Sequence, residues 1–152
     1  MEERFETFTV LMAKIRRNVQ RLKNGEVAEY NLKSPHVSCL YYLNKHESLT
    51  ATELCEFCSE DKAAISRSIV QLEKEGYVLH KKNKGKAYKA GISLTESGKV
   101  VAEQITQKID HYIGIIGDGL TERERFVFYK GLRRTSKNLE QICQSFDDEG
   151  QK

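Results

Sequence analysis

The sequence predicts a mainly α-helical fold with one small β-hairpin, and three observations lead to this prediction. The 152-residue chain contains a single proline, and its apolar residues recur at helical spacing over most of its length. Two short helix patterns follow one another between Thr50 and Gly76. The helical spacing then breaks in the lysine-rich segment from Tyr77 to Thr95, which has turn residues at its centre. Helix, tight turn, helix and hairpin in this order are the elements of a winged helix-turn-helix.

The first two helices are expected on either side of a polar segment. Apolar residues near the amino terminus step by three and four positions, at Phe5, Phe8, Met12, Ile15, Val19 and Leu22. This stripe predicts an amphipathic helix of roughly six turns. Ser34 and Pro35 are residue types preferred at the N-cap and at the first helical position, so a second helix should run from there to about His46.

The third and fourth helices are short and make up the expected helix-turn-helix. Thr50 and Glu53 have the spacing of a capping box, which opens the third helix. Asp61 is expected to cap the fourth helix, and Gly76 to end it in the left-handed conformation. The inward face of the fourth helix is apolar and consists of Ile65, Ile69 and Leu72.

Two longer helices are expected in the carboxy-terminal third. Thr95 caps the first of them, and a glycine-rich break at residues 117–119 ends it. Thr121 and Glu124 form a second capping box and open the last helix. The inward stripe of that helix steps alternately by four and three positions, at Phe128, Leu132, Thr135, Leu139, Ile142 and Phe146.

Charge is sorted along the chain, although the formal net charge is only +3. Residues 53–61 contain four acidic side chains and no basic one. The hairpin has the opposite character, with no acid between its first and last lysine: Lys81, Lys82, Lys84, Lys86 and Lys89. Such a hairpin can lie along DNA phosphates, or it can be a soluble hairpin whose edges are protected by lysine.

The outer face of the fourth helix suits the major groove of double-stranded DNA. It presents Lys62, Ala63, Ser66, Arg67, Val70 and Lys74. Arg67 can donate two hydrogen bonds to a guanine edge, and Ala63 or Val70 can touch a thymine methyl group. The alternative is an ordinary solvated helix face. The lysine hairpin follows this helix directly, however, so both would meet one duplex.

The long terminal helices indicate how the chain is organised. One small central core leaves their apolar stripes uncovered, and pairing with a second copy about a two-fold axis would bury them. We therefore expect a helical dimerisation region at residues 1–33 and 100–146, a DNA-binding region at 34–99 and an acidic tail at 147–152. The alternative is that the stripes cover one another within a monomer.

Three stretches resemble the MarR family of transcription regulators: LTATELCEFCSEDKAAISRSIVQLEKEGYV, ISLTESGK and GLTERERFVFYKGL. The resemblance extends over roughly residues 34–139. It implies an obligate dimer that binds a pseudo-palindromic operator, usually as a repressor that is released by a small phenolic or other ligand, an oxidant or a metal. At the family's major-groove positions this chain has Lys62, Ala63, Ser66 and Arg67. At the wing tip, Lys86 and Ala87 stand where many members have Asp-Arg, so lysine contacts to phosphate are expected there.

The four cysteines are expected to be free thiols, because the chain should stay in the cytoplasm. Cys55 and Cys58 have the spacing of a redox or metal pair, but no second pair or nearby histidine completes a zinc site, and we expect both in the core. Cys39 and Cys143 are candidates for peroxide-sensing thiols, although the thiol-sensing branch of the resembled family typically places its cysteine early in the first helix. The alternative from another class is a thiol oxidoreductase that uses Cys55 and Cys58.

An effector is expected to bind between the dimer helices and the DNA-binding lobe, and the candidates to line its cavity are Tyr41, Tyr42 and Tyr112. A metal-sensing alternative would need His36 or His46 to approach His111.

We expect no cofactor, no bound metal ion and no catalysis. No run of about 18 apolar residues and no signal peptide occur, so we expect no membrane contact. The third hypothesis is a winged-helix module that binds another protein.

Overall fold

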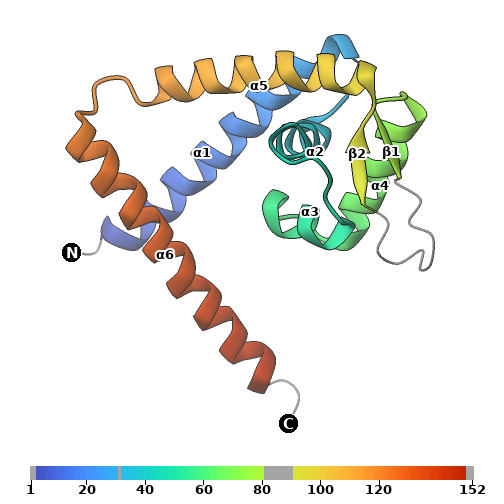
Figure 1. Ribbon diagram of the computed structural model, residues 1–152. Coiled ribbons are helices and arrows are strands. Elements are labelled where there is room, and N and C mark those ends of the chain that lie inside the picture. The colour runs from blue at the N-terminus through green and yellow to red at the C-terminus, as the bar shows by residue number, and fades with distance from the viewer. Residues whose placement is uncertain (1–2, 31, 81–90, 150–152) are drawn as a thin grey trace. The chain divides into compact units, whose positions relative to one another are not determined.

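The computed structural model describes residues 3–30, 32–80 and 91–149. Its elements along the chain are α1 (Glu3–Val27), the 3-10 helix η1 (Ala28–Tyr30), α2 (Ser34–Lys45), α3 (Ala51–Cys58), α4 (Lys62–Lys74), β1 (Val78–His80), β2 (Ile92–Leu94), α5 (Glu96–Ile116) and α6 (Glu122–Glu149) (Figure 1). The predicted mainly α-helical fold with a small hairpin is thereby confirmed. The chain divides into two compact units, Met1–Asp110 and His111–Lys152.

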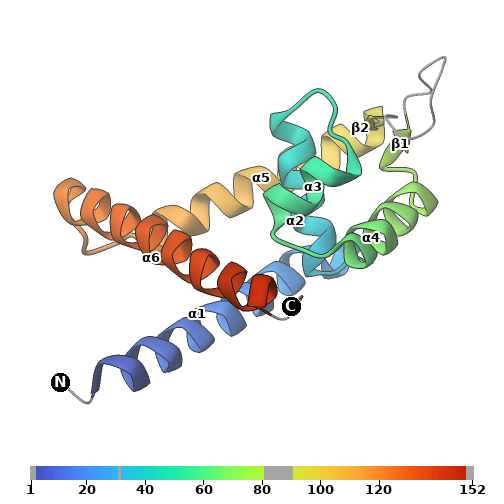
Figure 2. The same ribbon diagram turned by 90° about the horizontal axis from the view of Figure 1, so that it is seen from below.

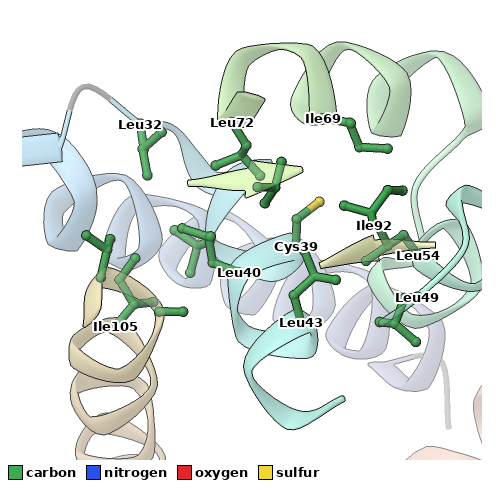
Figure 3. Close-up of a cluster of buried hydrophobic side chains, with 14 of the residues drawn as sticks. Leu32, Cys39, Leu40, Leu43, Leu49, Leu54, Ile69, Leu72, Ile92 and Ile105 are labelled. Atoms are coloured by element: carbon green, nitrogen blue, oxygen red, sulfur yellow. The ribbon is translucent and has the colours of Figure 1, made fainter. Parts of the chain in front are cut away.

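The first unit has one hydrophobic core, to which α2, α3, α4, both strands and the first half of α5 contribute (Figure 3). Its largest side chains without solvent exposure are Leu40, Leu54, Ile65, Leu72, Ile92 and Ile105. Three of these six come from the helix-turn-helix, so that motif is anchored in the core. Helix α1 packs against α2 at the edge of this core.

The start of α2 differs from the prediction by one residue. Lys33 is the N-cap, and its backbone N–H donates to Nδ1 of His36 at 2.9 Å. Ser34, which was expected to be the cap, is the first helical residue, and its N–H donates to Oδ1 of Asn24 on α1 at 2.7 Å. A side chain from another helix therefore satisfies the first amide of α2, which has no acceptor within its own helix.

The predicted caps of α3 and α4 are confirmed. The Glu53 N–H donates to the Thr50 hydroxyl at 3.2 Å, and the Thr50 N–H donates to the Glu53 carboxylate at 2.7 Å. Oδ1 of Asp61 accepts from the Ala64 N–H at 2.7 Å. The turn between the two helices passes through Ser59, whose φ of 53° lies in the left-handed region.

The hairpin stem is antiparallel, with Val78 opposite Leu94 and His80 opposite Ile92. Ile92 also exchanges two backbone hydrogen bonds with Leu49, at 2.7 and 3.0 Å. The stem is thus linked to the segment that precedes α3. Gly76 has a φ of 76°, as predicted for the residue that ends α4.

The second unit contains the end of α5 and the whole of α6. The predicted capping box is confirmed, because the Thr121 N–H donates to the Glu124 carboxylate at 2.8 Å and the Glu124 N–H donates to the Thr121 hydroxyl at 3.3 Å. Large apolar side chains are exposed along α6, among them Phe126, Phe128, Leu139, Ile142 and Phe146. Within the described ranges, no helix is long and apolar enough to cross a lipid bilayer.

Candidate nucleic-acid interface

Helix α4 has one buried face and one exposed face, as its sequence predicts. Ile65, Ile69 and Leu72 lie in the core. Ser68 is buried beside them, and its hydroxyl donates to the carbonyl oxygen of Ala64 at 2.9 Å. The exposed face carries the predicted DNA-contacting residues, Lys62, Ala63, Ser66, Arg67, Val70 and Lys74. Figure 2 shows α4 at the edge of the first unit. The six side chains are exposed within that unit, so they are accessible to a partner.

A groove of about 420 Å³ separates the start of α2 from α4. Lys33 and His36 line it from the α2 side, and Arg67 and Gln71 line it from the α4 side. Burial, together with the nearby Lys33 ammonium group, lowers the pKa of His36 below its ordinary value, so its ring is neutral near pH 7. The positive charge at this groove therefore comes from Lys33 and Arg67.

Sequence reasoning missed Lys33 and His36 as part of this surface. They precede Arg67 by about thirty residues, and the polar segment before α2 was expected to be only a connection. Helix α2 packs against α4, and this packing brings the two segments together. No local pattern in the sequence signals such a contact.

Side chains fix the hairpin stem to the end of α4. The imidazole of His80 on β1 and the carboxylate of Glu73 on α4 form a hydrogen-bonded pair. The hydroxyls of Thr95 and Ser97 both donate to the carbonyl oxygen of Gly76, at 2.6 and 3.0 Å. The predicted wing lysines (Lys81, Lys82, Lys84, Lys86 and Lys89) lie outside the described residues.

Two of the three candidate effector residues line one cavity. Its volume is about 260 Å³, and its walls include Tyr41 and Tyr42 of α2, Phe57 of α3 and Lys23 of α1. The rings of Tyr42 and Phe57 stack with centroids 5.2 Å apart, and burial raises the pKa of Tyr42 above its ordinary value. Tyr112 belongs to the second unit, where its ring lies 5.6 Å from that of His111.

The four cysteines are free thiols. Cys39 is buried. Cys55 and Cys58, which were expected in the core, are half-buried and pack against it. Cys143 is exposed on α6. Cys58 also lines the cavity that contains the two tyrosines.

The metal-sensing alternative receives no support from the described part of the chain. No group of three or more His, Cys, Asp and Glu side chains is placed there to hold a metal ion. His46 instead stacks on Phe57, with ring centroids 5.1 Å apart. His36 faces the groove beside α4.

Comparisons with known proteins point to one family. The family model described as MarR family matches residues 30–85, which contain α2, α3, α4 and β1. An HTH-type transcriptional regulator of Bacillus cereus is 29% identical over 122 residues, which cover 79% of this chain and 80% of the relative. The chain is thus similar to the MarR family over its helix-turn-helix. The resemblance noted in its sequence is thereby confirmed.

Solved MarR-family structures share its fold. The MarR protein from Peptoclostridium difficile is 25% identical and has a TM-score of 0.78, with 88% of each chain covered. The S. aureus MepR–DNA complex has a TM-score of 0.79 at 18% identity, with 87% of this chain and 97% of MepR covered. A MarR transcriptional regulator from Methanosarcina mazei has a TM-score of 0.75 at 20% identity, with 90% and 92% covered.

Proposed function

We propose that this protein is a MarR-family transcription regulator that binds double-stranded DNA as a homodimer and represses transcription from a pseudo-palindromic operator until a small-molecule effector releases it. The observation that carries the proposal is the polar outer face of α4. The apolar inner face of the same helix is buried in the core and holds the helix in place. Hydrogen bonds to Gly76 fix the hairpin stem to the end of this helix. The proposal includes no catalytic step. A regulator of chromosomal genes would act in the cytoplasm of a bacterium or archaeon.

Base reading is assigned to the middle of the exposed face of α4. Arg67 would donate two hydrogen bonds to the O6 and N7 atoms of a guanine, and Ser66 would bond to a neighbouring base or phosphate. Ala63 and Val70 are exposed and apolar, so they can contact a thymine methyl group. These four residues lie within two turns of α4 and would meet successive base pairs.

Phosphate contacts would fix the position of α4 on the duplex. Lys62 and Lys74 lie at the two ends of α4, and Lys33 adds a cation across the groove from Arg67. The wing lysines Lys81, Lys82, Lys84, Lys86 and Lys89 would follow the adjoining backbone, because the hairpin stem is fixed to the end of α4. Each lysine–phosphate contact releases a counterion, so affinity should fall steeply with salt.

A homodimer is proposed because both units expose apolar helix surface. In the first unit, Leu11 and Ile15 of α1 are about half exposed. In the second unit, Phe126, Ile142 and Phe146 of α6 are more than half exposed. Exposed apolar helix surface of this kind is typical of an interaction site, and an isologous dimer would bury it while setting two copies of α4 at a fixed spacing.

The tyrosine-lined cavity is the proposed effector site. Tyr41 and Tyr42 give it aromatic walls, and Lys23 supplies one cation, a combination that suits a small aromatic anion. Helices α2 and α3 both line the cavity, and both pack against α4. A ligand that binds the DNA-competent arrangement less well than another arrangement would lower operator affinity.

The decisive test is the Arg67→Ala variant. Duplexes selected by the wild-type protein from a random pool would serve as operator DNA in a fluorescence-anisotropy titration. Loss of the guanine contact should weaken operator binding by about 1–3 kcal/mol and relax the preference at one base position. Arg134→Ala on α6 removes the same charge from an exposed position in the second unit, and it should leave affinity unchanged.

Equal affinity and equal base preference for Arg67→Ala and the wild-type protein would remove Arg67 from the proposed contacts. Failure of the wild-type protein to bind any duplex at low salt would contradict DNA binding itself. A winged-helix module that binds another protein would then be the better interpretation.

A further inference from the structure

The start of α2 flanks the helix that is proposed to enter DNA. Lys33 and His36 line one wall of the groove of about 420 Å³, and Arg67 and Gln71 line the other. A major groove is about 12 Å wide, and a helix with its side chains is about 10–12 Å in diameter, so α4 would fill it. Side chains that flank α4 would therefore face the phosphates along the edge of that groove.

The first amides of α2 are already used within the protein. The Lys33 N–H donates to Nδ1 of His36 at 2.9 Å, and the Ser34 N–H donates to Oδ1 of Asn24 at 2.7 Å. Pro35 has no N–H, and the His36 N–H donates to the carbonyl oxygen of Lys33 at 2.9 Å. A hydrogen bond from this wall of the groove to a phosphate must therefore come from a side chain.

The hydrogen bond from Lys33 fixes the tautomer of His36. Because Nδ1 accepts from an amide, it carries no proton, and in the neutral ring the proton is on Nε2. Burial, and then the Lys33 ammonium group, lowers the pKa of His36 against the opposing effect of Glu75 at the end of α4. The ring is therefore neutral near pH 7.

Nε2 of His36 is open to solvent. It has no hydrogen-bond partner in the part of the chain that the structure describes. Over the same residues, no buried side-chain nitrogen or oxygen lacks a partner, so an unpaired Nε2 cannot be buried. His36 thus offers the groove an accessible, uncharged N–H group.

We propose that the Nε2–H group of His36 donates a hydrogen bond to a DNA phosphate beside α4, as an uncharged donor. Lys33 would bring a cation to the same strand, whereas Arg67 would read a base. A neutral donor replaces no counterion and reads no base, so His36 would hold the duplex in register with α4 without adding salt dependence or base preference. The inference rests on the proposed function, because it adds a contact to the proposed DNA interface.

The state of His36 is tested on the full-length protein without DNA. A long-range proton–nitrogen correlation spectrum of ¹⁵N-labelled protein near pH 7 reports which ring nitrogen carries the proton, and the His36→Gln variant identifies the signals of His36. We expect a protonated Nε2 and an unprotonated Nδ1. A proton on Nδ1, or a cationic ring at this pH, would overturn the proposal.

Two substitutions of equal size separate DNA binding from folding. His36 is the third residue of α2, where a glutamine or glutamate side chain can reach back to the cap amide as the imidazole does. His36→Gln and His36→Glu should both keep this cap, so both should unfold near the wild-type temperature. The glutamine also offers an uncharged N–H, whereas the glutamate carboxylate would repel a phosphate.

The two variants should differ on the selected operator DNA. We expect His36→Gln to bind within about 3-fold of the wild-type protein, and His36→Glu to bind roughly 100-fold more weakly. Gln141→Glu makes the same change of charge at an exposed position on α6 and should leave affinity unchanged. Operator affinity of a folded His36→Glu variant equal to that of the wild-type protein would remove His36 from the interface.

Salt titrations distinguish an uncharged donor from a cation. His36→Ala should weaken binding to operator and to unrelated duplex by the same factor, roughly 10-fold, without changing the slope of log affinity against log salt. Lys33→Ala should make that slope shallower by about 1. A shallower slope for His36→Ala would indicate a cationic imidazole, and an altered base preference would indicate base reading. Either result would contradict the assigned role.

The proposed function can fail separately from the state of His36. Wild-type protein that binds no duplex at low salt would contradict DNA binding, and the phosphate contact with it. The tautomer measured without DNA would still decide the protonation of His36. Wild-type protein that binds DNA, together with equal binding by His36→Glu, would overturn the phosphate contact alone.

Discussion

Gly98 lies where the hairpin meets α5, and the absence of a side chain there allows the two elements to pack closely. A Cβ atom built at this residue would lie 1.8 Å from the carbonyl oxygen of Tyr77. The Gly98 N–H also donates to the Thr95 hydroxyl at 3.0 Å, so the residue cannot move away without losing the helix cap. The motif ISLTESGK therefore contains the cap of α5 and also a glycine that is required because a side chain would not fit.

Gly98→Ala should destabilise the protein by about 2 kcal/mol or more, because the added methyl group collides with backbone that cannot easily shift. Urea unfolding at a fixed protein concentration measures the change. Gly114→Ala is the matched control on the same helix, because a Cβ there meets nothing within 4 Å. That control should raise stability by about 0.5–1 kcal/mol, and similar destabilisation by both substitutions would contradict the steric explanation.

The cap of α3 makes stability depend on pH. Hydrogen bonds from the Thr50 backbone and then from its hydroxyl lower the pKa of Glu53 below its ordinary value. A lowered folded-state pKa contributes stability that is present above the unfolded pKa and is lost as pH falls through the folded pKa. Acidification should therefore weaken this cap.

Glu53→Gln keeps an acceptor at the cap but cannot ionise. The variant should lose less stability than the wild-type protein when pH is lowered from about 6 to about 3. Glu56→Gln, at an exposed position on the same helix, is the control. Parallel pH profiles for wild type and Glu53→Gln in thermal unfolding would show that the cap is not the titrating contact.

The caps at Thr50, Asp61 and Thr121 could be predicted because donor and acceptor lie within three residues of each other. The hydrogen bond from the Ser34 amide could not be predicted, because its acceptor is Asn24 on another helix. Hydrogen bonds inside one turn are visible in a sequence, whereas hydrogen bonds between helices need the packing that brings them together.

At the scale of one element, adjacent residues of α4 have different roles: one stabilises the core and the next is proposed to contact DNA. Ile69 is 6% exposed and Val70 is 63% exposed. Ile69→Ala should lower the free energy of unfolding by about 2–4 kcal/mol, because it leaves a cavity in the core. Val70→Ala should change stability by less than about 0.5 kcal/mol, yet weaken discrimination of a thymine-containing site. Denaturation and operator titration of both variants would show the split, and a large stability loss for Val70→Ala would contradict the assignment of faces.

Helical periodicity was sufficient to identify the two faces of α4. It could not reveal the groove between Lys33 and Arg67, because the groove depends on how α2 packs against α4.

For the whole molecule, the exposed apolar surface on α6 is the basis for the proposed dimer. Ile142→Glu introduces a charge where a partner helix would pack, and it should shift the protein toward the monomer in analytical ultracentrifugation. Gln141→Glu adds the same charge at the neighbouring exposed position and should leave the dimer intact. A monomeric wild-type protein at micromolar concentration, or an unchanged Ile142→Glu dimer, would contradict the assigned interface.

The sequence indicated the order of all six helices and the hairpin, but it did not indicate where the compact units divide. The division falls within α5, between Asp110 and His111. Helix α1, expected in the dimerisation region, belongs to the same unit as the helix-turn-helix because Lys23 and Asn24 bond to Ser38 and Ser34. The predicted functional regions and the compact units therefore divide the chain at different residues.

The hydrogen bond between Asn24 and the Ser34 amide has a further consequence. A first-turn amide normally exchanges its proton with solvent readily, because no carbonyl within its own helix protects it. Here the protector belongs to α1, so exchange at Ser34 requires α1 to separate locally from α2. The exchange rate of this one proton thus measures how often the junction between the amino-terminal helix and the helix-turn-helix opens.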